Sequence, residues 1–81
     1  METICGEMIA LMTSGPTLHE IIRFQHSDET VQKVIYLVDA YKQGALSEGE
    51  ERELRLFYKY DHFVEELKKR AYRRLQRDRN I

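Results

Sequence analysis

Residues 47–77, SEGEERELRLFYKYDHFVEELKKRAYRRLQR, contain no proline, and their one glycine, Gly49, stands near the start. Ser47 followed three residues later by Glu50 matches a capping box, in which each side chain accepts a hydrogen bond from the other residue's backbone N–H. Acidic residues crowd the first turns and basic residues the last ones, which suits the helix dipole. The stretch therefore predicts a single helix over residues 48–77, on the order of 45 Å long.

Apolar side chains recur every three or four residues along this helix, the spacing that gathers them on one side. They are Phe57, Tyr60, Val64, Leu67, Ala71 and Leu75, with Leu56 and Phe63 beside them. At about 100° per residue they span an arc of roughly 120°, which is wider than a coiled-coil seam. We therefore expect this face to pack against more than one neighbour, as the interface with a second copy of the chain or with another protein.

Three shorter helices are expected before the long one, at about residues 4–13, 18–24 and 28–43. Thr17 and Glu20 form a second capping-box pattern, Ser27 can cap the third helix, and Gly44 is suited to end it. No stretch alternates between apolar and polar residues as a half-buried strand does. The sequence therefore predicts one all-α domain over residues 1–81.

Only residues 44–46 separate the third helix from the cap of the long one, and so short a connection favours an antiparallel helical hairpin. The third helix would then end near Phe63 and leave Leu67, Ala71 and Leu75 uncovered. Either the short helix and the extra N-terminal helix fold back over these residues, or a second copy covers them. We favour a homodimeric helical bundle, because a chain of 81 residues often needs oligomerisation to complete its core.

Charge is distributed unevenly along the chain, although the formal net charge is only −1. Residues 1–66 carry a net −7 and residues 67–81 a net +6. The basic side chains that could contact nucleic acid are Lys68, Lys69, Arg70, Arg73, Arg74 and Arg77. They would equally complement the helix dipole and pair with the glutamates of a second, antiparallel copy, which is the interpretation that we favour.

Catalytic and metal-binding patterns are not recognisable in the sequence. His62 and Glu66 share one side of the long helix, but a di-iron bundle needs Glu followed by His three residues later. His19 and His26 are expected at the surface, at a cap and at a turn. With glycine too sparse for a phosphate-binding loop, we expect no catalytic residue, no cofactor, no metal and no enzymatic activity.

The single cysteine, Cys5, cannot form an internal disulfide, which suits a reducing cytoplasm. Residues 1–12 lack the basic start and long apolar run of a signal peptide or a membrane span. We therefore expect a soluble, cytoplasmic protein that does not act at a membrane. A charged fraction of 33%, rich in Glu, Arg and Lys, also leans toward a thermophilic source.

Four segments resemble a group of small all-helical bacterial proteins, plentiful in cyanobacteria and also met in thermophiles: residues 16–24 (PTLHEIIRF), 27–32 (SDETVQ), 44–50 (GALSEGE) and 61–71 (DHFVEELKKRA). The chain also resembles a small all-helical Thermotoga protein. The resemblance implies an antitoxin-like or accessory protein whose partner could be a cognate toxin. Group members often carry a longer N-terminal portion, whereas this chain begins about a dozen residues before Ser14, so a DNA-binding or regulatory function housed in that portion is not carried over as an expectation.

Two functions follow as hypotheses. The first is a non-enzymatic protein that acts through protein–protein interaction, for example as the antitoxin-like member of a pair. The second is a nucleic-acid-binding module that uses the basic C-terminal helix.

Overall fold

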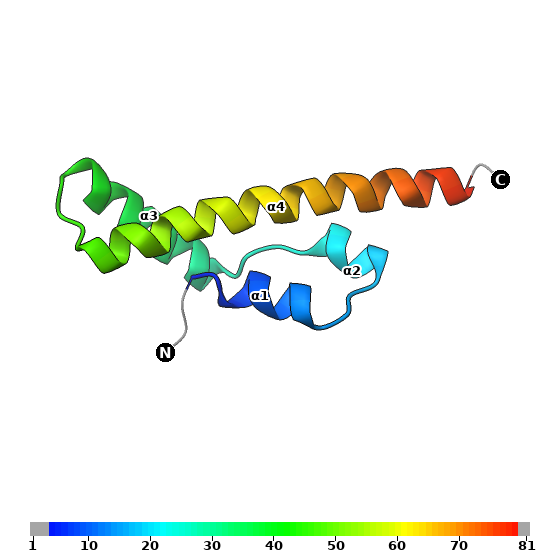
Figure 1. The fold of residues 1–81 in the computed structure, drawn as a ribbon, viewed down its shortest axis with the longest axis horizontal. Coiled ribbons are helices and arrows are strands. Elements are labelled where there is room, and N and C mark those ends of the chain that lie inside the picture. Colours follow the sequence, from blue (N-terminus) through cyan, green and yellow to red (C-terminus); the bar gives the residue numbers. More distant parts are fainter. Residues whose placement is uncertain (1–3, 80–81) are drawn as a thin grey trace.

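The computed structural model describes residues 4–79 of the chain, and this part contains four helices. In chain order they are α1 (Gly6–Thr13), α2 (Leu18–Arg23), α3 (Asp28–Lys42) and α4 (Glu48–Arg79). No strand occurs among these residues, which confirms the all-α class. The molecule measures 54 × 24 × 19 Å, and α4 runs along its length (Figure 1).

Side-chain caps stand at the start of α2, α3 and α4. The backbone N–H of Ser47 donates to Glu50 Oε1 at 3.1 Å, and the N–H of Glu50 donates to Ser47 Oγ at 3.2 Å, which completes the capping box of α4. Hydrogen bonding of the Glu50 carboxylate to Ser47, to its backbone N–H foremost, holds the pKa of Glu50 below its usual range. Before α2, Thr17 Oγ1 accepts from the N–H of Glu20, but the Glu20 carboxylate meets the Thr17 hydroxyl and not its N–H. This second box is therefore only half formed.

Gly44 ends α3 by adopting φ +69°, in the left-handed region that favours glycine. The N–H of Gly44 donates to the carbonyl of Tyr41 at 3.0 Å, and the next N–H, from Ala45, donates to the carbonyl of Ala40 at 2.8 Å. The last bond is the six-residue closure of a Schellman motif. The chain thereby leaves α3 within two residues and reaches the cap of α4.

Helices α1, α2 and α3 all contact α4 (Figure 1). The backbone N–H of Ile4, just before α1, donates to Glu53 Oε1 at 3.0 Å, and Lys68 Nζ donates to the carbonyl of Phe24, just after α2, at 3.1 Å. The first two helices therefore fold back over α4, and Ala71 is only 4% exposed. The sequence left open whether the first two helices or a second copy covers this part of α4. At Ala71 the cover comes from the chain itself.

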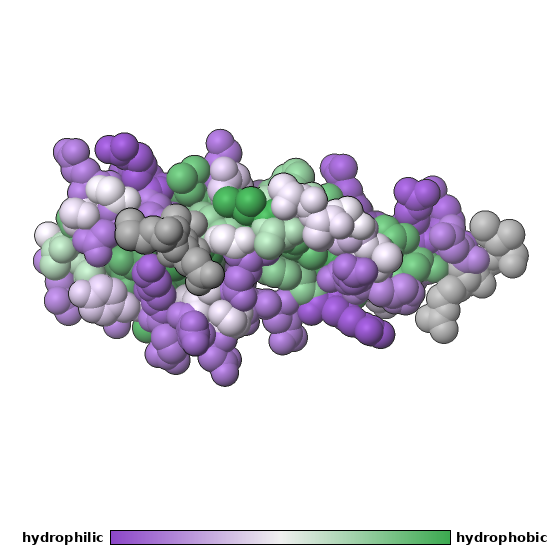
Figure 2. Space-filling model, turned by 90° about the horizontal axis from the view of Figure 1, so that it is seen from below, coloured by the Kyte–Doolittle hydropathy of each residue, from purple (hydrophilic) through white to green (hydrophobic). Residues whose placement is uncertain are grey.

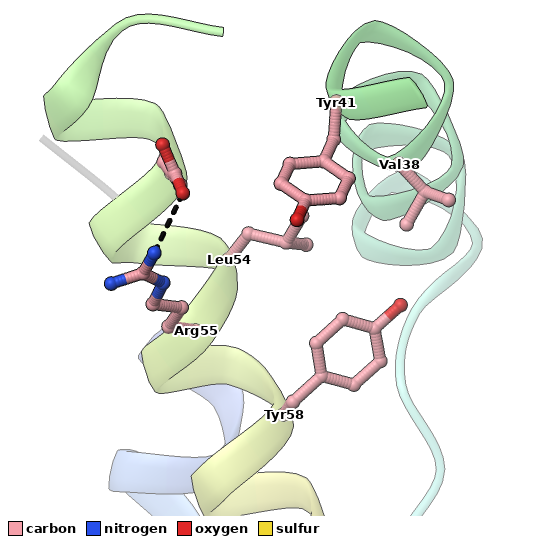
Figure 3. Close-up of a pocket in the computed structure, with 6 residues that line it drawn as sticks. Val38, Tyr41, Leu54, Arg55 and Tyr58 are labelled. Carbon is pink, nitrogen blue, oxygen red and sulfur yellow. Dashed lines mark hydrogen bonds and ion pairs between the residues drawn. The ribbon is translucent and has the colours of Figure 1, made fainter. Parts of the chain in front are cut away.

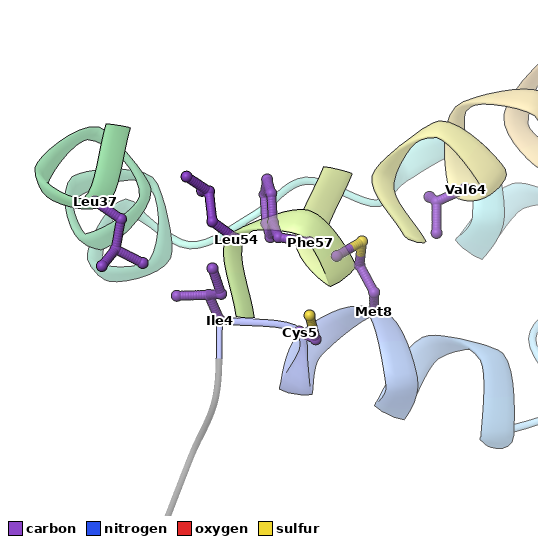
Figure 4. Close-up of a cluster of buried hydrophobic side chains, with 7 residues drawn as sticks. All are labelled: Ile4, Cys5, Met8, Leu37, Leu54, Phe57 and Val64. Atoms are coloured by element: carbon purple, nitrogen blue, oxygen red, sulfur yellow. The ribbon is translucent and has the colours of Figure 1, made fainter. Parts of the chain in front are cut away.

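The buried core joins the N-terminal segment to α3 and α4 (Figure 4). Its members are Ile4, Cys5, Met8, Leu37, Leu54, Phe57 and Val64. Burial raises the pKa of the Cys5 thiol, so the lone cysteine is a core residue with little thiolate character. None of the helices in residues 4–79 is both long and apolar enough to cross a membrane.

Candidate interaction surface

The six apolar residues expected at an interface divide into two groups. Phe57, Val64 and Ala71 are buried by the chain's own helices, with exposures of 6%, 0% and 4%. They are therefore core residues of the single chain and not surface contacts. The expectation went wrong here because α1 and α2 cover the line that a second copy was expected to cover. Tyr60, Leu67 and Leu75 are half-buried.

Beside the buried line, α4 carries a second apolar row that stays accessible. Leu56 is 43% exposed and Phe63 is 50% exposed, and they alternate with half-buried Tyr60 and Leu67. We call these four residues the α4 stripe. Their spacing of four, three and four residues is that of the a and d positions of a coiled coil. They fall within an arc of about 60° at 100° per residue, so they form one narrow seam.

The α4 stripe lies on the flank of α4 that faces away from α3. On the other flank, Leu54 and Tyr58 turn toward α3 and line a pocket of about 300 Å³ with Val38 and Tyr41 (Figure 3). Residues of the stripe line a separate surface hollow, formed by Lys59, His62, Phe63, Glu66, Leu67 and Arg70. In the described part of the chain, Leu56 and Phe63 are 43% and 50% exposed, far more than the core residues, so no helix there buries them.

A second exposed apolar area lies on α3. Val31 and Ile35, one helical turn apart, are 42% and 49% exposed, and Tyr41 beside the pocket is 57% exposed. We call Val31, Ile35 and Tyr41 the α3 face. Figure 2, which views the molecule from the side of α1, shows apolar side chains bordered by hydrophilic ones. The chain thus has at least two separate surfaces on which another protein could pack.

The expected basic residues differ in how firmly they are held. Lys68 is held by the Phe24 carbonyl and lies 3.6 Å from Glu65, and Lys69 lies 3.3 Å from Glu66. The remaining four, Arg70, Arg73, Arg74 and Arg77, are exposed and share a surface hollow with Asp78. They form no ion pair with any residue that the structure describes. Figure 1 shows that the C-terminal end of α4 extends beyond α2.

His26 is not the surface residue that the sequence predicted. Its side chain is 17% exposed, and its Nε2 lies 2.9 Å from Asp61 Oδ1 on α4. The ring also packs against Phe24 and Phe57, with centroid distances of 5.1 and 5.0 Å. Sequence reasoning missed this contact because it joins residues 35 positions apart. Its effect is to fasten the segment between α2 and α3 to the middle of α4.

Glu7 of α1 makes a second long-range fastening at the start of α3. Its carboxylate accepts hydrogen bonds from the Thr30 hydroxyl and from the backbone N–H and hydroxyl of Ser27. These bonds, the Thr30 bond foremost, hold the pKa of Glu7 below its usual range. Ser27 also caps α3 as expected, since its Oγ accepts from the N–H of Thr30 at 3.2 Å.

The described residues contain no cluster of side chains suited to bind a metal ion. No group of three or more His, Cys, Asp or Glu side chains there is placed to hold a metal ion. His62 is exposed on α4, and His19 is exposed on α2. The polar contact of His26 joins the segment between α2 and α3 to α4, and those of Glu7 join α1 to the start of α3, which is a structural use of both groups.

Comparisons with known proteins found no matching protein-family model, no similar curated protein and no similar solved structure. The resemblance to small bacterial antitoxin-like proteins therefore stays a prediction. What the chain does has to be argued from its surfaces.

Proposed function

We propose that this protein acts by protein–protein association and that it forms a homodimer through the α4 stripe. The observation that carries the proposal is the exposure of Leu56 and Phe63, 43% and 50%, in a seam with coiled-coil spacing. Large apolar side chains in a continuous row are favourable to bury, at about 25 cal/mol for each Å² removed from water. A chain of 81 residues gains from such burial because its own core is small.

An antiparallel hairpin of α3 and α4 is part of this proposal. It is supported by the short connection over residues 43–47 and by the pocket that Val38, Tyr41, Leu54 and Tyr58 line from both helices. Such a hairpin would leave the α3 face outside the dimer. We assign that face to a second protein, which in the antitoxin-like role would be a cognate toxin. A reducing, cytoplasmic setting fits the buried, unpaired Cys5.

Paired variants test which apolar surface associates. Leu56→Gln with Phe63→Gln removes the exposed half of the α4 stripe, and Val31→Gln with Ile35→Gln is the matched control on α3, since the exposures of the two pairs are close. Sedimentation equilibrium should show that the α4 pair weakens dimerisation at least tenfold and that the α3 pair leaves it unchanged. The opposite order would move the interface to α3, and a monomeric parent protein would exclude self-association altogether.

Nucleic-acid binding by the end of α4 is the second candidate function. The observation in its favour is the exposure of Arg70, Arg73, Arg74 and Arg77 without ion pairs to the described residues. Phosphate contacts made by these groups would weaken as salt is added. Titration of duplex DNA and of RNA at two salt concentrations tests the candidate. Binding that is insensitive to salt and survives Arg73→Gln with Arg74→Gln would reject it.

A further inference from the structure

The orientation of the two copies can be derived, and this inference rests on the homodimer proposed above. We infer that the α4 helices of the two copies pair antiparallel, with Leu56 of each chain against the partner's Leu67. That register also brings Tyr60 against the partner's Phe63. Because a two-fold dimer repeats every contact, the two pairs give four consecutive apolar layers. All four residues of the α4 stripe are then used, and none faces a charged residue.

Polar residues beside the stripe support the same register. Lys59 and Glu66 each stand one residue before a stripe residue, Tyr60 and Leu67, and so lie on one flank of the seam. In antiparallel pairing, residues at this position face their equivalents on the partner. Lys59 would therefore lie near the partner's Glu66, and the symmetry makes this ion pair twice. Lys59 is exposed, and among the described residues Glu66 pairs with Lys69 alone, at 3.3 Å on the surface, so both side chains can take part.

Charge complementarity along α4 decides between antiparallel and parallel pairing. Residues 48–66 carry a net −4 and residues 67–79 a net +6. An antiparallel pair places the acidic half of each helix beside the basic half of the other. The layer outside Leu56 then brings Glu53, whose Oε1 also accepts the Ile4 N–H, near the partner's Arg70. A parallel pair would place the four exposed arginines of one copy beside the same four of the other. Like charges on neighbouring helices repel each other.

Helix dipoles point to the same answer. The acidic first turn of α4 lies at its positive end and the arginines at its negative end, so each end already carries compensating side chains. Antiparallel neighbours also align opposite dipole ends. No comparable asymmetry exists on the α3 face, whose exposed residues are apolar or aromatic. The second copy is therefore the occupant that suits the α4 stripe.

Cross-linking tests the register directly. In a Cys5→Ala background, Leu56→Cys and Leu67→Cys are made as separate proteins, and each is checked by circular dichroism for the helix content of the parent. After mild oxidation, an equimolar mixture should give a disulfide-linked dimer, whereas each protein alone should give little. Each protein linking to itself would indicate parallel pairing and overturn the inference. A species that light scattering shows to be dimeric but that never cross-links in the mixture would also overturn it.

Charge exchange provides a second measurement that does not depend on cysteine. Lys59→Glu places two like-charged pairs across the interface and should raise the dimer dissociation constant by about tenfold. Adding Glu66→Lys should restore most of the affinity, because the pair is re-formed with reversed signs. Failure of the double variant to recover would overturn the register. In each of these outcomes the parent protein remains dimeric, so failure of the register is distinct from failure of the homodimer, which only a monomeric parent would indicate.

Discussion

His26 Nε2 lies 2.9 Å from Asp61 Oδ1, and this contact fastens the segment between α2 and α3 to the centre of α4. The imidazole sits against the rings of Phe24 and Phe57, so it contributes both a hydrogen bond and apolar packing. Together with the bonds to Glu7, it explains how two short helices keep a fixed place along a long one. The long helix in turn keeps Leu56 and Phe63 exposed on its other flank.

Replacing His26 should therefore cost more than replacing its partner. His26→Ala removes a hydrogen bond and two aromatic contacts and should lower the free energy of unfolding by about 2 to 3 kcal/mol. Asp61→Asn keeps an oxygen that can accept the bond and should cost less than about 1 kcal/mol, as expected for a partly exposed pair. Urea denaturation followed by circular dichroism measures both. Equal losses would argue against the packing role of the ring.

Stability should fall on acidification in a way that depends on Glu7. Because the folded-state pKa of Glu7 is lowered by the hydrogen bonds from Thr30 and Ser27, its contribution is present above the unfolded value and is lost as pH falls through the folded one. Between about pH 5 and pH 3 the urea midpoint of the parent should drop further than that of Glu7→Gln. Identical curves would mean that these bonds do not favour the ionised form.

Alanine substitutions at Gly44 and at Gly49 should change the stability of the protein in opposite directions. Gly44 has φ +69°, so Gly44→Ala should destabilise the protein by about 1 to 2 kcal/mol. Gly49 lies in the first turn of α4 with only Ser47 Oγ at 4.0 Å from an added Cβ, so Gly49→Ala should be neutral or stabilise by up to about 1 kcal/mol. Thermal midpoints of the two variants give the comparison. A neutral Gly44→Ala would contradict the Schellman closure of α3.

Substitutions at the adjacent residues Phe63 and Val64 should have different effects, the first on dimerisation and the second on the stability of the fold. Val64 is 0% exposed, and Val64→Ala should lower the free energy of unfolding by about 2 kcal/mol through lost burial and a cavity. Phe63 is 50% exposed, and Phe63→Ala should weaken the dimer while costing the helix fold little. Circular dichroism in urea, read at concentrations above and below the dimer dissociation constant, distinguishes the two effects. A concentration-independent loss for Phe63→Ala would place Phe63 in the core instead.

Local sequence signals predicted the helices closely, because caps and stops depend on neighbouring residues. Ser47 with Glu50, Ser27 and Gly44 all act as expected, and each observed helix boundary lies within two residues of its expected position. The side of α4 that is buried could not be predicted to the same degree. Two apolar rows lie side by side on that helix, and only the path of α1 and α2 decides which row is covered.

The misplaced residues show this limit clearly. Phe57, Val64 and Ala71 have the spacing of an interface and of a core alike, and the fold makes them core. His26 has no neighbour in sequence that signals its partner, because Asp61 is brought to it by packing. Leu56 and Phe63, which the sequence placed beside the seam, are the ones left exposed. The fold therefore decides that these residues stay exposed in the α4 stripe, although the sequence analysis had already named them.

The mass of the unmodified protein in solution tests the central claim most directly. Light scattering coupled to gel filtration, at micromolar concentrations and moderate salt, should give twice the 9.7 kDa mass of the chain. It should fall toward the mass of one chain in the variant that carries Leu56→Gln and Phe63→Gln. A mass of 9.7 kDa for the unmodified protein across the whole concentration range would contradict the proposed homodimer.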